Sequence, residues 1–94
     1  MFVGVLWFEG IVPGCRSLKQ KRQVVRSLRD RLRGKFNVAV SEVDYQDKWQ
    51  RTAIGIVTVS GDHTHLQSSL DEIDRYVRAF PAISVLTVER EVLT

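Results

Sequence analysis

The alternation of hydrophobic and polar positions divides the chain into six segments of regular structure. Four of them are rich in β-branched and aromatic residues or place apolar residues at every second position, which is typical of strands: residues 2–8, 36–43, 52–60 and 83–92. Two others repeat apolar residues every three or four positions, which predicts amphipathic helices over residues 18–33 and 62–80. The predicted order is therefore βαββαβ.

Both predicted helices have recognisable ends. Ser17 precedes Gln20 by three residues, the spacing of a capping box, and predicts the start of the first helix. Gly34 predicts its end, because glycine is common just beyond a helix. In the second helix, Asp62 is a candidate N-cap and the Phe80-Pro81 pair predicts the end. The apolar line of the first helix is Leu18, Val25, Leu28 and Leu32, and that of the second is Leu66, Leu70, Ile73 and Val77.

This order corresponds to two βαβ halves in tandem. Right-handed crossovers place both helices on one face of a four-stranded antiparallel sheet. The expected fold is thus a ferredoxin-like α+β sandwich, formed as one domain by residues 1–94, a length that suffices for a single core.

The second face of such a sheet has no helices to cover it. The first strand nevertheless carries Val3, Val5 and Trp7 on one side and Phe2, Leu6 and Phe8 on the other. An uncovered apolar face often marks an interface, so we expect a homo-oligomer that associates through the sheet, with Val5, Trp7 and Val57 in the contact. The alternative is an apolar face that a monomer tolerates.

Charge is concentrated in the first helix. The chain has 14 lysines and arginines and a net charge of +3, and nine of these cations lie between Cys15 and Lys35 with a single acid, Asp30. At about 100° per residue, five of them form one stripe about 80° wide. These residues, called the basic stripe below, are Lys19, Arg22, Arg26, Arg29 and Arg33.

Like charges in a stripe repel one another, and a bound polyanion would offset that cost. The basic stripe therefore predicts contact with the phosphates of ribosomal or other RNA, with little dependence on base sequence. The alternative is a solvated helix face, or one neutralised by acids of a neighbouring subunit or of residues 42–47. Base stacking on the sheet is not expected, because the strand at 52–60 has aliphatic residues where an RNA-recognition motif has aromatic ones.

The chain has one acidic cluster, formed by Glu42, Asp44 and Asp47 and followed by Trp49 and Arg51. Carboxylates so spaced could hold a hard cation or a small ligand. The alternative is structural, in which they pair with Arg51 and Lys48 around the hairpin or across a dimer interface.

Enzyme chemistry finds little support in the sequence. No nucleophile, base and orienting residue assemble, and there is no glycine-rich phosphate loop, so we expect a non-catalytic protein without a cofactor or metal. The single Cys15 excludes an internal disulfide and fits a reducing compartment. The apolar runs are strand-sized, so no membrane association is expected, and the predicted location is the cytoplasm.

Three segments resemble a known family: Ser17 to Arg22 (Ser-Leu-Lys-Gln-Lys-Arg), Phe36 to Asp44, and Trp49-Gln50-Arg51. They are similar to the YlxP-like family of small bacterial proteins. This resemblance implies a ferredoxin-like fold and a role that is not established. Members are often encoded beside translation initiation factor two and ribosome-binding factor A, which implies ribosome assembly or translation. The positions that the resemblance marks are Lys19, Lys21, Arg22, Glu42, Asp44, Trp49 and Arg51.

Three hypotheses follow from the sequence. The first is a non-catalytic RNA- or ribosome-associated protein that binds through the basic stripe. The second is a homo-oligomeric interaction module whose basic helix binds an acidic protein partner. The third is a small-ligand or metal site at the acidic hairpin.

Overall fold

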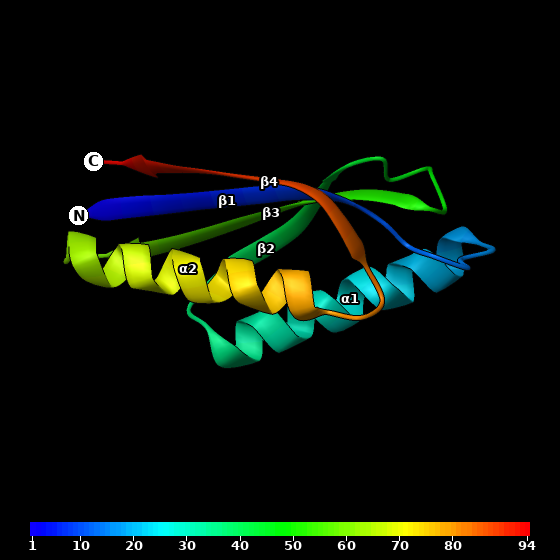
Figure 1. Cartoon of the computed structure of the whole chain (residues 1–94), viewed down its shortest axis with the longest axis horizontal. Coiled ribbons are helices and arrows are strands. Elements are labelled where there is room, and N and C mark those ends of the chain that lie inside the picture. Colours follow the sequence, from blue (N-terminus) through cyan, green and yellow to red (C-terminus); the bar gives the residue numbers. More distant parts are fainter.

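Two helices lie across one face of a four-stranded antiparallel sheet in the computed structural model, which describes residues 1–94 (Figure 1). The elements are β1 (Phe2–Ile11), α1 (Leu18–Lys35), β2 (Ala39–Asp44), β3 (Arg51–Ser60), α2 (His63–Ala79) and β4 (Ser84–Leu93). The strand order is β2-β3-β1-β4, and every neighbouring pair is antiparallel. The predicted ferredoxin-like α+β fold is therefore confirmed, and β2 and β4 are its edge strands.

The core lies between the sheet and the helices. In β1, Leu6 and Phe8 point toward the helices and are buried, whereas Val5 and Trp7 point to the other side. A side chain at Gly4 would place its Cβ 3.1 Å from Leu66 and Leu70, so glycine allows α2 to approach β1 closely. The buried apolar residues supplied by the other elements include Leu28, Leu32, Ile54, Ile56, Leu66, Leu70, Ile73 and Val77.

The start of α1 agrees with the predicted capping box. The Ser17 hydroxyl accepts a hydrogen bond from the Gln20 N–H (3.1 Å), and the Gln20 side-chain oxygen accepts one from the Arg16 N–H (2.8 Å). These bonds satisfy amide groups that the first turn of a helix leaves without partners. Similarly, the Asp62 carboxylate accepts a hydrogen bond from the His65 N–H at the start of α2.

The predicted end of α1 at Gly34 is wrong. The helix continues to Lys35, and the Phe36 N–H donates a 2.8 Å hydrogen bond to the Leu32 carbonyl. Gly34 does not adopt the positive φ of a glycine cap; that conformation occurs at Gly14, in the turn before the helix. Phe36 caps the helix in an extended conformation and packs its ring edge-on against Tyr76, so the helix ends at the residue whose side chain joins the core.

The face of the sheet opposite the helices is apolar along β1 and β3, whereas β4 places Glu91 beside Val5 and Glu89 beside Trp7 at its margin. On this open face, Val5 lies opposite Val57, and Val3 lies opposite Val59. Val57 and Val59 are 40% and 49% exposed. No helix in the structure has both the length and the apolar character needed to cross a membrane.

Candidate nucleic-acid interface

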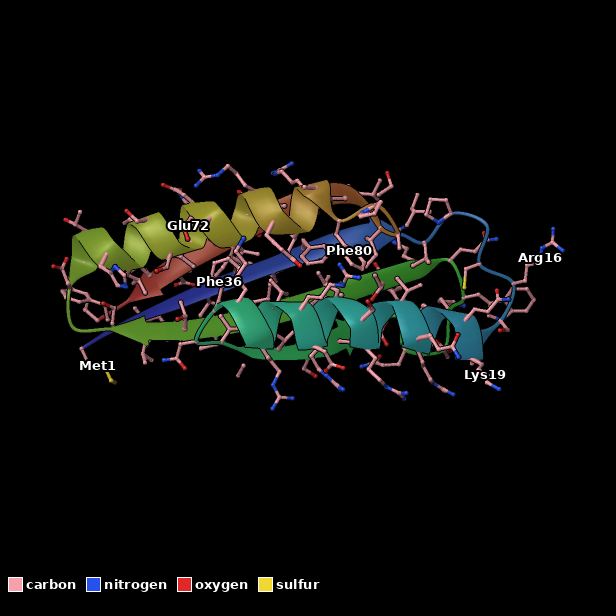
Figure 2. The ribbon with its side chains drawn as sticks, turned by 90° about the horizontal axis from the view of Figure 1, so that it is seen from below. Met1, Arg16, Lys19, Phe36, Glu72 and Phe80 are labelled. Atoms are coloured by element: carbon pink, nitrogen blue, oxygen red, sulfur yellow. The ribbon has the colours of Figure 1, made fainter.

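The basic stripe lies on the solvent side of α1. Leu28 and Leu32 turn the opposite side of the helix into the core, which fixes how the helix is rotated. Figure 2 shows nitrogen-tipped side chains along the edge of α1 that faces away from α2, with Lys19 at one end of the row. Lys19, Arg22, Arg26 and Arg33 are exposed and Arg29 is half-buried.

Few of these cations have acidic partners. The ion pairs of the structure are Lys21–Glu42, Arg29–Asp30, Arg51–Glu9, Arg78–Asp74 and Arg90–Asp71. Within the basic stripe only Arg29 is paired, with its exposed neighbour Asp30 at 3.3 Å. The carboxylates of residues 42–47 thus do not form ion pairs with the stripe, and its positive charge is left to solvent.

A groove runs between the basic stripe and the edge strand β2. It has a volume of about 240 Å³ and is lined by Arg22, Val25, Arg26, Arg29, Val40, Ser41 and Glu42. Three arginine side chains therefore border this groove. On the outer edge of β2, the backbone is not paired with another strand. Such a groove has the charge and the donors to hold phosphate oxygens.

Glu42 does not cancel this charge, because its own partner is Lys21. The Lys21 Nζ lies 3.0 Å from the Glu42 Oε2, and the side chains are 0% and 14% exposed, respectively. The same ammonium group donates to the carbonyl oxygens of Tyr45 (2.5 Å) and Arg51 (3.3 Å), and the Thr52 hydroxyl donates to Glu42 (2.6 Å). Lys21 therefore joins α1 to both ends of the β2–β3 connection.

This buried lysine is the residue of the site that the charge pattern alone did not identify. Its position nevertheless contains a signal. Lys21 falls in the series 18, 21, 25, 28 and 32, so it occupies an inward position of the apolar line of α1. A cation at such a position predicts a buried acidic partner from another element.

A second network holds the connection on the open face. The Glu9 carboxylate accepts hydrogen bonds from the Tyr45 hydroxyl (2.8 Å) and from Arg51 (3.2 Å), and the Arg51 guanidinium lies 4.8 Å from the centre of the Tyr45 ring. The hydrogen bond to Glu9 raises the pKa of the Tyr45 phenol above its ordinary value. Residues 45–50 are thus attached to the sheet on both of its faces.

The acidic cluster is dispersed by this arrangement. Glu42 faces α1, whereas the Asp44 carboxylate accepts a hydrogen bond from the Tyr45 N–H (2.7 Å) and Asp47 is exposed in the connection. Pairing of these acids with Arg51 and Lys48 around the hairpin is wrong, because Arg51 pairs with Glu9 and Lys48 forms no ion pair within the chain. No group of three His, Cys, Asp or Glu residues in the chain is arranged to hold a metal ion.

The predicted interface residues do lie together. Val5, Trp7 and Val57 line one shallow groove of about 380 Å³ on the open face. Val43 borders the same groove and covers Gly55, where an added Cβ would lie 3.2 Å from its side chain. The structure therefore brings these three residues into one apolar surface.

Residues 3–90 match the family described as "Protein of unknown function (DUF503)". The chain belongs to this family. It is also 38% identical over 81 residues to "Uncharacterized protein YlxP" of Bacillus subtilis (strain 168), an alignment that covers 86% of this chain and 88% of that protein. The YlxP-like resemblance of the sequence is thereby confirmed.

The fold is shared more widely than the family. A crystal structure of SnoaB, a cofactor-independent oxygenase from Streptomyces nogalater, superimposes with a TM-score of 0.51 over 99% of this chain and 91% of that chain, at 16% sequence identity. At this identity the likeness shows a common fold and carries no information about chemistry.

Proposed function

We propose that this family member is a non-catalytic RNA-binding protein whose basic stripe contacts the phosphate backbone, with ribosomal RNA during ribosome assembly or translation as its target. One observation supports this most strongly: four cations on one exposed helix face have no acidic partner in the structure. They are Lys19, Arg22, Arg26 and Arg33. Each like-charged i,i+4 pair costs the isolated helix about 0.2–0.5 kcal/mol, a cost that phosphate contacts would remove.

The dimensions of the stripe suit an extended polyanion. From Lys19 to Arg33 the helix rises about 21 Å at 1.5 Å per residue, so the cations form a row rather than a point. A single small anion would neutralise one or two of them, whereas a nucleic-acid strand presents a charge at every nucleotide. The groove beside β2 gives the strand a defined path, with arginines on one wall and Ser41 on the other.

The non-catalytic part of the proposal rests on how the reactive side chains are used. The Cys15 thiol is buried and donates a hydrogen bond to the Ser17 carbonyl (3.2 Å). His63 packs edge-on against the Phe2 ring. Both side chains are thus engaged in contacts within the fold, which supports a binding protein that acts through charge.

Binding to ribosomal RNA at one fixed salt concentration tests the proposal. The variant Arg22→Glu/Arg26→Glu reverses two cations of the stripe, and Arg75→Glu/Arg78→Glu is a control with the same charge change on the exposed side of α2. We expect the stripe variant to bind at least about tenfold more weakly than the control, because it loses phosphate contacts. Equal affinities of the two folded variants would overturn the proposal.

We infer as a second function that two copies associate through their open faces. Three strands have ten residues and are about 33 Å long, β2 has six and is about 20 Å long, and the spacing between strands is about 4.8 Å, so the sheet has an area of about 600 Å² per copy. Two copies would bury about 1,200 Å², the lower end of the range for specific interfaces. The apolar row of Val3, Val5, Val57 and Val59 supports a second copy as the occupant, because like faces bury like residues.

The two functions are compatible. The open face and the basic stripe lie on different sides of the molecule, so a face-to-face dimer would leave both stripes accessible. If the dimer forms and RNA does not bind, the stripe would instead serve an acidic protein partner. The test above then gives no affinity for RNA in any variant, while the dimer persists.

A further inference from the structure

The connection between β2 and β3 presents an aromatic side chain to solvent. Trp49 is 52% exposed, although burial of a large aromatic side chain usually stabilises a protein. It borders an open hollow of about 710 Å³ whose lining residues are Tyr45, Asp47, Lys48, Trp49, Gln50 and Arg51. Neither the core nor the basic stripe accounts for this residue.

The hollow is built on a fixed segment of chain. Tyr45 adopts φ of 61°, a conformation that is uncommon for residues other than glycine and is held here by its bonds to Asp44 and Glu9. The Lys48 N–H donates to the Tyr45 carbonyl (3.0 Å), and the Val12 N–H donates to the Gln50 carbonyl (2.9 Å). The first of these bonds closes a turn within the segment before Trp49, and the second attaches the segment after Trp49 to the residue that follows β1.

The groups around the hollow suit a flat, anionic ligand. Trp49 offers an indole ring, and Arg51 lies against the Tyr45 ring with its guanidinium held by Glu9. Lys48 is exposed and has no carboxylate partner, so it is available for a phosphate. Aromatic rings beside cations are the elements with which proteins bind unpaired bases of single-stranded nucleic acid.

The segment that forms the hollow is also attached to α1, close in sequence to the first residues of the basic stripe. Lys21 follows Lys19 and precedes Arg22, and its ammonium group contacts the carbonyl oxygens of Tyr45 and Arg51. The first turns of α1 are therefore attached to the segment that carries Trp49. A strand whose phosphates follow the stripe toward Lys19 would therefore approach the segment that carries Trp49.

We propose that the hollow binds an unpaired nucleobase of the RNA strand that occupies the basic stripe. The base stacks on Trp49, and Lys48 contacts the adjacent phosphate. Asp47 and Gln50 offer an acceptor and an amide to the edge of the base. The inference rests on the proposed function and sharpens it, because it makes single-stranded RNA the preferred ligand over a duplex, whose bases are already stacked.

Two oligonucleotides of equal length, one single-stranded and one folded into a duplex hairpin, test the proposal with the full chain. Stacking contributes about 1–3 kcal/mol per base, so Trp49→Ala should weaken binding to the single strand about 5- to 150-fold and leave duplex binding unchanged. Arg22→Glu/Arg26→Glu should weaken both. In a Trp7→Phe background, where Trp49 is the remaining tryptophan, the single strand should quench the emission and the duplex should not.

The outcomes separate the two proposals. If Trp49→Ala binds the single strand as tightly as the wild type, or loses both ligands equally, the nucleobase site is overturned and the stripe stands. If the wild-type protein binds neither RNA, the proposed function falls and the nucleobase site falls with it.

Discussion

Lys21 and Glu42 form an ion pair beneath the basic stripe, with the lysine side chain fully buried and 3.0 Å between Nζ and Oε2. The three hydrogen-bonding partners of the ammonium group come from β2, from the β2–β3 connection and from the start of β3. This pair therefore couples the helix that carries the stripe to the segment that carries Trp49. If both proposed contact sites bind RNA, this pair would limit how far they can move relative to each other.

Replacing Lys21 with methionine should destabilise the protein strongly. The Glu42 carboxylate would keep only its bond from Thr52, and two carbonyl oxygens would lose a donor. Breaking one side of a buried pair costs about 3–5 kcal/mol, and the partial exposure of Glu42 places the expected loss near 3 kcal/mol. Denaturant unfolding measures it, with Lys19→Met as the control, which should stay within about 0.5 kcal/mol of the wild type. Equal stability of the two variants would refute the role of the pair.

The fold followed from the sequence to a large extent because its signals are local and agree with one another. The two capping motifs, the apolar line of α2 and the β-branched strands point to the same βαββαβ order. Gly34 was misleading because the end of α1 depends on the contact of Phe36 with Tyr76, which is distant in sequence. Local propensity carries no information about such a contact.

The site could be predicted only in part. The basic stripe is a property of one helix, so its spacing and exposure follow from periodicity. Periodicity does not predict the ion-pair partners of Glu42 and Arg51. These partners lie on α1 and β1, and they meet Glu42 and Arg51 only when the sheet has formed. The acids of residues 42–47 look like one cluster in the sequence and are separated by a register shift between Glu42 and Asp44.

Gly34→Ala should stabilise the protein. Gly34 lies within α1 without a positive φ, and an added Cβ would meet no atom within 4 Å. Alanine in such a position gains about 0.5–1 kcal/mol through its helix propensity and the smaller entropy of the unfolded chain. Gly14→Ala is the contrasting variant. Gly14 has φ of 72°, which alanine adopts only with strain, so this substitution should destabilise the protein. A loss of stability at Gly34 on thermal unfolding would contradict the helix end described above.

The Tyr45 phenol should titrate above the ordinary tyrosine pKa of about 10. Its hydrogen bond to Glu9 favours the protonated form, so the bond stabilises the folded state below that pKa, and the contribution is lost as the pH rises through the raised value. The difference in tyrosinate absorbance between the wild type and Tyr45→Phe isolates this group. Glu9→Gln should lower the midpoint of the titration. An unchanged midpoint in Glu9→Gln would show that Glu9 is not the cause.

Trp7→Glu should abolish self-association. Trp7 faces the open side of the sheet beside Val5 and Val57, and a carboxylate there would have to be desolvated in a dimer. Sedimentation velocity should give twice the chain mass of 10.8 kDa for the wild type and the single mass for the variant. Gln23→Glu, on the exposed side of α1, is the control and should remain dimeric. A wild-type monomer at high concentration would exclude the interface.

The dependence of RNA affinity on salt tests the central claim most directly. If four unpaired cations of the basic stripe each neutralise a phosphate of a single strand, the logarithm of the association constant should fall with the logarithm of salt concentration with a slope of about −3. Removing two of them in Arg22→Ala/Arg26→Ala should make the slope about 1.4 less steep. A slope near zero in the wild type, or one that the double variant leaves unchanged, would show that the stripe does not bind RNA phosphates.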